Sequence, residues 1–192
     1  MCARYYLDRE LYDDIEPIVG EIQDSDRYVG DVRPTDRPFV ITATEKPIVA
    51  YDIAWGYPAK GGKGLLINAR AETITEKPTF RNGIHNHRCV MPARGFYEWD
   101  RDKNKVTFFM QDRSPIFLAG CYDEFQGERR FTIITTEAND SMLKVHDRMP
   151  LMIEQGAVED WLLTDRYKDM LRMPMPELDN HRDYEQLTLD VF

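Results

Sequence analysis

The chain reads Arg88-Cys89-Val90-Met91-Pro92-Ala93-Arg94-Gly95-Phe96-Tyr97-Glu98-Trp99 near its middle, and this stretch decides the fold. A glycine followed by three bulky residues is typical of a β-strand, and Gly95 predicts a bulge in that strand. Glu98 lies among aromatic residues, which would shield its carboxyl group from water. Desolvation raises the pKa of a carboxyl group, so Glu98 could exchange protons near neutral pH. A surface glutamate that alternates with inward-facing rings explains the pattern equally well.

Segments that favour strands lie on both sides of this stretch, with a few helical segments between them. We expect strands at residues 39–42, 48–51, 65–67, 106–111, 116–121, 130–135 and 151–153. We expect helices at residues 8–20, 136–145 and 157–163, with Pro17 limiting the first and Thr136 capping the second.

A cysteine follows the initiator methionine in the opening sequence Met1-Cys2-Ala3-Arg4. Aminopeptidases remove Met1 when the second side chain is small, and the new terminus then carries an α-amine and a thiol on one residue. Both groups titrate within about two units of neutral pH, so each can act as a nucleophile. An aldehyde forms an imine with such an amine, and the sulfur then closes the imine into a five-membered thiazolidine. A chance cysteine on a frayed chain end is the alternative.

The composition narrows the class of protein. With 192 residues, 42% of them hydrophobic, the chain is long enough to bury a core, and no apolar run or signal peptide indicates a membrane. Its three cysteines are far apart, which argues against disulfides and for a reducing cytoplasm. The formal net charge of -9 allows a nucleic-acid partner only where arginines and lysines gather locally.

Two features of the sequence bear on metals and cofactors. His85, His87 and Cys89 would share one face of a strand, as zinc ligands do, but a fourth ligand with the usual spacing is missing. The glycine-rich loop at residues 60–64 lacks the spacing and the Lys-Ser/Thr ending of a Walker loop. We therefore expect no metal and no cofactor, with partly exposed histidines beside a buried thiol.

Five motifs follow one another along the chain. They are Cys2-x-Arg4, Trp55-Gly56, Asn68-Ala69-Arg70-Ala71-Glu72-Thr73, Arg88-Cys89-x-x-Pro92-Ala93-x-Gly95-Phe96-Tyr97-Glu98-Trp99 and His146-Asp147-Arg148-Met149-Pro150. Together they resemble the SRAP family, named for SOS-response-associated peptidases, which includes proteins that crosslink themselves to abasic sites in single-stranded DNA. The resemblance implies one domain over residues 1–192, although residues 163–192 do not resemble the family's closing segment. It also implies an α+β fold in which a curved, mainly antiparallel sheet closes toward a barrel, with helices outside it and the N-terminus in a groove.

The resemblance also implies catalytic roles. Cys2, after loss of Met1, would supply both nucleophiles, and Asn68 would hold this residue by hydrogen bonds. Glu98 would assist proton transfers at the sugar. His146 would act as acid and base during ring opening and imine formation.

DNA contacts follow from the same resemblance. Arg4, Arg70 and Arg148 match family positions that contact phosphates, which guanidinium groups bind well. Stacking on Trp55 or Tyr57 could hold the strand without reading a base. The expected partner is single-stranded DNA with abasic sites, bound by a monomer in the cytoplasm that associates with the nucleoid.

Two other functions use the same residues. Cys2 as a thiolate, His146 as its base and Asn68 or Glu98 as the orienting group would make an N-terminal-nucleophile peptidase, acting on its own Met1 or on other peptides. A noncatalytic single-strand binder would need no Cys2 and would bind in a salt-sensitive way that ignores abasic sites.

Overall fold

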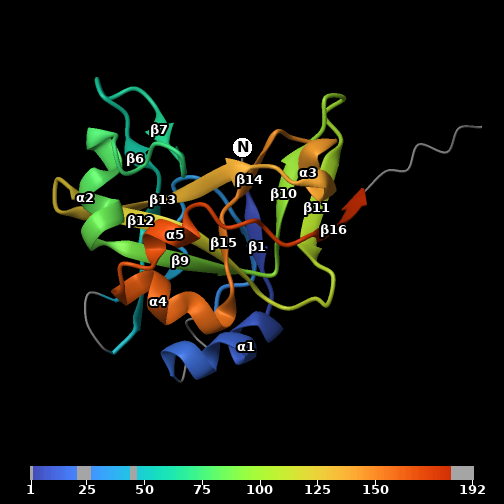
Figure 1. The fold of residues 1–192 in the computed structure, drawn as a ribbon, viewed down its shortest axis with the longest axis horizontal. Helices are drawn as coiled ribbons and strands as arrows, with labels where there is room; N and C mark the ends of the chain where they lie inside the picture. Colours follow the sequence, from blue (N-terminus) through green and yellow to red (C-terminus); the bar gives the residue numbers. More distant parts are fainter. Residues whose placement is uncertain (1, 21–26, 44–46, 183–192) are drawn as a thin grey trace, which may run out of the picture.

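The computed structural model describes residues 2–20, 27–43 and 47–182 (Figure 1). Among these residues the strands form three hydrogen-bonded sheets with mainly antiparallel neighbours, accompanied by a few helices. The fold is therefore α+β, as predicted. The expected closure toward a barrel is not found in this part of the chain, because the strands of the two large sheets pair only within their own sheet.

The smaller of the two large sheets carries the first strand of the chain. Its order is β16-β11-β10-β1-β2. The strands are β1 (Tyr5–Leu7), β2 (Gly30–Val32), β10 (Gly95–Trp99), β11 (Lys105–Met110) and β16 (Leu178–Arg182). Every pair in this sheet is antiparallel, with Tyr5 opposite Phe96 and Glu98 opposite Val106.

The larger sheet is organised around one long strand, β13 (Glu128–Glu137). Its other strands are β3 (Phe39–Thr42), β4 (Val49–Asp52), β5 (Ala54–Trp55), β8 (Asn68–Arg70), β9 (Arg88–Ala93), β12 (Ile116–Phe125), β14 (Arg148–Pro150) and β15 (Met152–Ile153). Antiparallel β12 and β14 follow one edge of β13, and parallel β5 and β8 follow the other. Strands β6 (Tyr57–Pro58) and β7 (Leu65–Leu66) form a separate pair.

The stretch at residues 88–99 joins the two large sheets, because β9 belongs to one and β10 to the other. A Cβ atom at Gly95 would lie 2.4 Å from the backbone oxygen of Phe108 and 2.7 Å from the ring of Tyr6. Only glycine permits this approach. The prediction of a single bulged strand is therefore wrong: the strand ends before Arg94, whose backbone N–H donates to the carbonyl of Tyr6 at 2.9 Å, and a strand of the other sheet begins at Gly95.

The helices are α1 (Glu10–Val19), α2 (Pro78–Asn86), α3 (Asp140–Leu143), α4 (Val158–Leu163) and α5 (Tyr167–Met170), with a 3₁₀ turn at Gln155–Ala157. In α1, Leu11, Tyr12 and Ile15 have helical spacing and are buried. The Asp8 carboxylate accepts the Leu11 N–H at 2.8 Å, and Arg94 binds both Asp8 and Asp14, which fixes α1 to the junction between the sheets.

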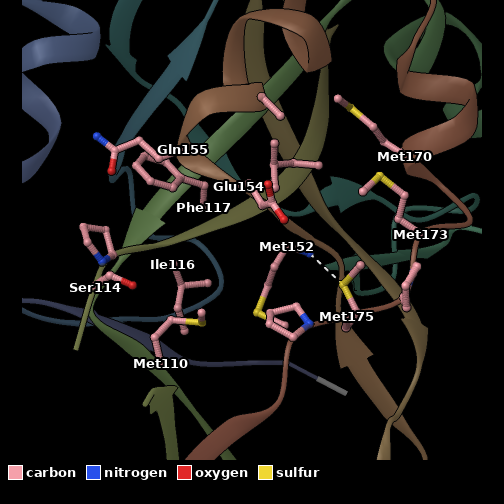
Figure 2. Close-up of a pocket in the computed structure, with 15 residues that line it drawn as sticks. Met110, Ser114, Ile116, Phe117, Met152, Glu154, Gln155, Met170, Met173 and Met175 are labelled. Carbon is pink, nitrogen blue, oxygen red and sulfur yellow. Dashed lines mark hydrogen bonds between the residues drawn. The ribbon is translucent and has the colours of Figure 1, made fainter. Parts of the chain in front are cut away.

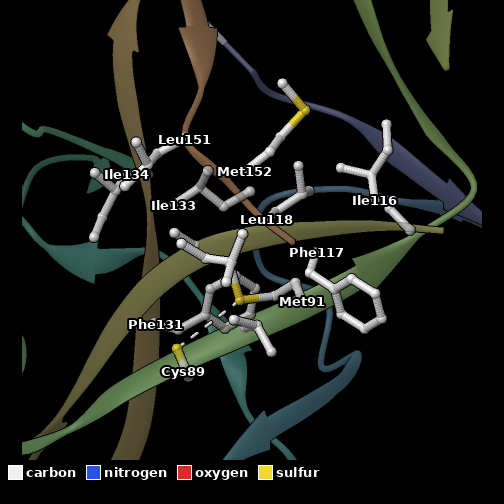
Figure 3. Close-up of a cluster of buried hydrophobic side chains, with 14 of the residues drawn as sticks. Cys89, Met91, Ile116, Phe117, Leu118, Phe131, Ile133, Ile134, Leu151 and Met152 are labelled. Atoms are coloured by element: carbon white, nitrogen blue, oxygen red, sulfur yellow. Dashed lines mark hydrogen bonds between the residues drawn. The ribbon is translucent and has the colours of Figure 1, made fainter. Parts of the chain in front are cut away.

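The hydrophobic core gathers side chains from both sheets and from the helices around them. Figure 3 shows its centre, where β9, β12 and β13 contribute Met91, Leu118 and Ile133. Cys89 and Cys121 are 0% exposed, and Cys121 is the small core residue that its apolar surroundings suggest. Cys2 belongs to the same cluster, so the start of the chain is part of the core.

Most predicted elements are present, with shifted ends. The prediction of a helix at residues 136–145 is largely wrong, since Thr136 lies in β13 and α3 has a single turn. The prediction that His85, His87 and Cys89 lie on one strand is also wrong. His85 lies in α2, where its ring bonds to the Tyr167 hydroxyl, whereas His87 stacks on Tyr122 at 5.0 Å. The three side chains therefore do not share a strand face.

Candidate functional site

Cys2 lies at the entry to β1 with only 1% of its surface exposed. The Asn68 side-chain amide donates a hydrogen bond to the carbonyl oxygen of Cys2 at 3.1 Å. Asn68 reaches this position because β8 pairs with β13 in parallel, which places it opposite Ile133. A residue of the larger sheet thus holds the start of the chain, whose first strand belongs to the smaller sheet.

Glu98 approaches Cys2 from β10. The strand lies beside the N-terminal segment, because the backbone N–H of Tyr97 donates to the carbonyl of Arg4 at 2.9 Å. Glu98 is only 4% exposed. The aromatic neighbours seen in the sequence therefore do remove this carboxyl group from water, and the reading as a surface glutamate is wrong.

The thiol of Cys2 is neutral in these surroundings. Burial raises the pKa of Cys2 far above its usual value, and the neighbouring Glu98 carboxylate raises it further, while a hydrogen bond from the Arg4 backbone acts in the opposite direction. A buried thiol of this kind is a poor nucleophile until a base removes its proton. Glu98 is the carboxylate whose charge acts on this thiol.

His146 lies between α3 and β14, two residues before Arg148. Its Nδ1 atom accepts the backbone N–H of Arg148 at 2.9 Å and lies 3.0 Å from a carboxylate oxygen of Asp147. These two contacts fix the orientation of the imidazole ring. His146 precedes β14, which pairs with β13, the strand that also pairs with β8 and Asn68.

Arg70 and Arg148 lie on strands that pair with opposite edges of β13, Arg70 opposite Thr135 and Arg148 opposite Glu137. Arg70 is exposed. Arg148 makes a bidentate ion pair with Glu72 at 2.7 and 2.9 Å, and it also donates to the Thr135 carbonyl at 2.6 Å. Hydrogen bonds from Arg148 lower the pKa of Glu72. The sequence did not predict this carboxylate partner for a cation expected to bind phosphate.

Arg4, the third arginine expected to bind phosphate, lies beside Trp99. Its guanidinium group is 5.1 Å from the ring centre of Trp99 and 3.6 Å from the Asp31 carboxylate. Trp99 is partly exposed and directly follows Glu98. A partly exposed ring beside an arginine suits stacking with a nucleic acid base.

The structure does not make Trp55 available for stacking. Its side chain is 0% exposed, with ring centres of Tyr5 and Phe131 at 5.5 and 5.8 Å and with its N–H bonded to the Ile67 carbonyl at 3.0 Å. Tyr57 is also 0% exposed. Trp99 was not among the predicted stacking residues, although its position next to Glu98 in the sequence was a usable signal.

Two cavities lie away from Cys2. A cavity of about 380 Å³ is lined by five methionines, which Figure 2 shows: Met110, Met152, Met170, Met173 and Met175. A second cavity of about 760 Å³ is lined by Glu72, Glu76, His85, Glu137 and Arg172, among others. The second adjoins the site through Glu72, whereas the first is lined by none of the predicted site residues.

Comparison with known proteins agrees with the motifs. The profile of the family described as SOS response associated peptidase (SRAP) matches residues 1–188, well past the last motif. This chain belongs to the SRAP family.

Curated relatives of the chain are named abasic site processing proteins. YoaM of Bacillus subtilis is 42% identical over 106 residues, which cover 50% of this chain and 47% of YoaM. YedK of Escherichia coli is 29% identical over 167 residues, covering 81% of this chain and 70% of YedK. HMCES of Xenopus tropicalis is 31% identical over 123 residues, covering 50% and 37%. The match therefore spans about half the length of the Bacillus relative.

Solved structures share the fold of this chain. A crystal structure of a protein from Bordetella bronchiseptica aligns with a TM-score of 0.78 at 23% identity, covering 94% of this chain and 99% of that one. A phage-related protein from the same organism aligns with a TM-score of 0.76 at 24% identity, covering 94% and 93%. Across the described part of the chain, no helix is long and apolar enough to span a membrane.

Proposed function

We propose that this SRAP protein attaches itself covalently to abasic sites in single-stranded DNA through Cys2. The supporting observation is the clamp on this residue, with the Asn68 amide on its carbonyl oxygen and the buried Glu98 carboxylate beside its thiol. A chance cysteine on a frayed end would have neither contact. The names of the relatives point to the same substrate.

The reaction begins once Met1 is removed and the α-amine of Cys2 is free. The abasic sugar in its open form presents an aldehyde at C1′. The amine adds to this carbon, and the resulting carbinolamine loses water to give an imine. His146 is the proposed acid and base for ring opening and water loss.

Ring closure then uses the thiol. The sulfur forms a bond to the imine carbon, and the electron pair of the C=N bond moves to nitrogen. Glu98 takes the proton from the thiol, and the ring nitrogen gains one proton in return. The step therefore needs no oxidant or reductant. Asn68 holds the backbone of Cys2 still, which places both nucleophiles of one residue against one carbon.

Arginines on both sides of Cys2 supply the DNA contacts in this proposal. Arg4 and Arg70 bind phosphates, and Arg148 joins them when a phosphate displaces Glu72. Trp99, in place of Trp55, offers a ring for a base next to the abasic sugar. Such a local cluster reconciles DNA binding with the net charge of -9.

Intact mass spectrometry tests this proposal. The parent protein without Met1 is mixed with a single strand that carries one abasic site, and we expect a product equal to the sum of both masses less one water. Cys2→Ala should give no stable product, and a strand without an abasic site is the matched control. Equally efficient, stable attachment of Cys2→Ala would refute the mechanism.

Peptidase activity is the second candidate, favoured by the family's description and by the base beside the Cys2 thiol. Removal of Met1 by the protein itself is compatible with crosslinking. Sustained cleavage of a peptide library by the mature protein would favour a protease, and absence of turnover would favour crosslinking. We also propose that residues 1–192 act as one monomeric domain, supported by the single hydrophobic cluster that runs from Cys2 to Leu178.

A further inference from the structure

Tyr5 carries a buried hydroxyl group without a partner. The side chain is 0% exposed, and among the described residues no atom accepts or donates a hydrogen bond to its oxygen. An unpaired buried hydroxyl destabilises a fold, and a phenylalanine of the same shape would avoid that cost. The position therefore calls for a reason other than packing.

The ring of Tyr5 is held firmly in the site. Backbone pairing places Tyr5 opposite Phe96, so its side chain lies on the same face of the sheet as Phe96 and Glu98. The buried Trp55 packs against the ring with 5.5 Å between centres. The tryptophan predicted to contact DNA thus helps to position a tyrosine beside Cys2.

Burial raises the pKa of the Tyr5 hydroxyl well above its usual value, and four neighbouring ionisable groups raise it further, in the order Cys2, Cys89, Tyr12 and Asp36. Cys89 bonds to the sulfur of Met91 in the core. The other two already have partners: Tyr12 donates to the Tyr28 carbonyl at 2.7 Å, and Asp36 accepts the Arg33 N–H at 2.8 Å. Of the four groups, only Cys2 changes its charge in the proposed reaction.

We propose that Tyr5 is a positioning residue whose hydroxyl donates a hydrogen bond to the sulfur of Cys2 when that sulfur is a thiolate. This inference rests on the proposed crosslinking function and adds a residue to it. Glu98 removes the thiol proton, the Tyr5 O–H then bonds to the negative sulfur, and the bond is released as the sulfur attacks the imine carbon. Tyr5 neither gains nor loses a proton. A thiolate is a better acceptor than a neutral thiol, which explains why the hydroxyl has no partner in the resting protein.

A double-mutant cycle tests this role. Tyr5→Phe should slow thiazolidine formation about tenfold at neutral pH, the effect of losing one hydrogen bond to a charged group. In the Cys2→Ala background the terminal amine still forms an imine, which borohydride traps. If Tyr5 acts through the sulfur, Tyr5→Phe should leave the rate of trapped imine formation unchanged there. Equal slowing in both backgrounds would assign Tyr5 a structural role and overturn the inference.

Stability gives an independent readout. Tyr5→Phe should not lower the melting temperature, because it removes an unpaired hydroxyl. Tyr12→Phe is the matched control, since it removes a buried hydroxyl that has a partner; it should lower the melting temperature and leave the rate of adduct formation unchanged. If the parent forms no adduct, the proposed function itself fails. If the parent reacts and Tyr5→Phe matches it at every pH, only the inference about Tyr5 fails.

Discussion

Arg88 and Arg148 are both largely withdrawn from water, but the protein holds them in different ways. The guanidinium group of Arg88 donates to five backbone carbonyls and lies 4.1 Å from the ring centre of Tyr167. These carbonyls belong to Ile84, His85, Trp161, Leu162 and Thr164, at the C-terminal ends of α2 and α4. A cation at two such ends satisfies orphan carbonyls and the helix dipoles together.

Arg148 has an exchangeable partner instead. Its main contact is the side chain of Glu72, which is 43% exposed, and its Nε atom is buried without a partner among the described residues. The same holds for the Tyr5 hydroxyl and for the side-chain oxygen of Asn68. The guanidinium group of Arg88 is fully paired within the fold, whereas Arg148, Tyr5 and Asn68 each keep a buried polar atom with capacity left for a substrate.

The largest expected effect is a loss of stability when Arg88, the arginine paired within the fold, is replaced. Arg88→Met should lower the free energy of unfolding by about 3–5 kcal/mol, because it leaves buried carbonyls at two helix ends unpaired. Urea denaturation measures this change. Arg37→Met is the control, since Arg37 is an exposed arginine paired with Glu128 and should cost at most about 1 kcal/mol. Equal losses would mean that Arg88 is not a structural clamp.

The next effect concerns the site. Glu98→Gln should slow adduct formation roughly 100-fold through loss of the base. It should also lower the pKa of Cys2, because the carboxylate is one cause of the raised value. A rate that rises with pH should therefore begin its rise at lower pH in the variant, measured by single-turnover kinetics. Glu124→Gln changes the same charge on the exposed surface of β12 and should leave both quantities unchanged.

A smaller effect is expected at Asn68. Asn68→Ala removes the hydrogen bond to Cys2, so the N-terminal residue should reach its reactive position less often, and we expect adduct formation to fall about tenfold. Stability should change by about 1 kcal/mol, the contribution of one hydrogen bond. Asn82→Ala removes an exposed amide that bonds to Asp123 and should have no effect on the rate. A rate for Asn68→Ala equal to that of the parent would contradict the clamp on Cys2.

The smallest expected effect concerns the ion pair between Arg148 and Glu72 and its influence on DNA affinity. Glu72→Gln should tighten noncovalent binding of single-stranded DNA about threefold at low salt, because a phosphate no longer competes with a carboxylate for Arg148. Fluorescence anisotropy at several salt concentrations measures this affinity. Glu76→Gln makes the same charge change without touching Arg148, so equal tightening would indicate a general charge effect only.

Acid titration tests how much the ion pair between Arg148 and Glu72 stabilises the fold. Arg148 lowers the folded-state pKa of Glu72, so this ion pair stabilises the fold above the ordinary pKa of a glutamate. That contribution is lost as the pH falls through the lowered value. The parent should therefore lose stability relative to Glu72→Gln between these two values, as measured by thermal unfolding across the acid range.

The amino-acid order was enough to predict the family, most strands and three residues that meet at the start of the chain. Cys2, Asn68 and Glu98 were recognised from short motifs, and the structure brings these three together. Motifs succeed here because the chemistry of an aminothiol, an amide and a carboxyl group depends on residue type. The strands at Phe39–Thr42 and Ile116–Phe125 were predictable because β-branched and aromatic runs favour extended chains.

Only the tertiary structure decided which side chains are available. The sequence predicted stacking on Trp55, but this side chain is buried in the core, whereas Trp99, which was not predicted, is partly exposed at the end of β10. Likewise, β13 brings Arg148 and Glu72 into contact from positions 76 residues apart. Side-chain exposure and ion pairing depend on strands that are far apart in the sequence and adjacent in the fold. The residues next to each side chain in the sequence do not determine which strands become adjacent.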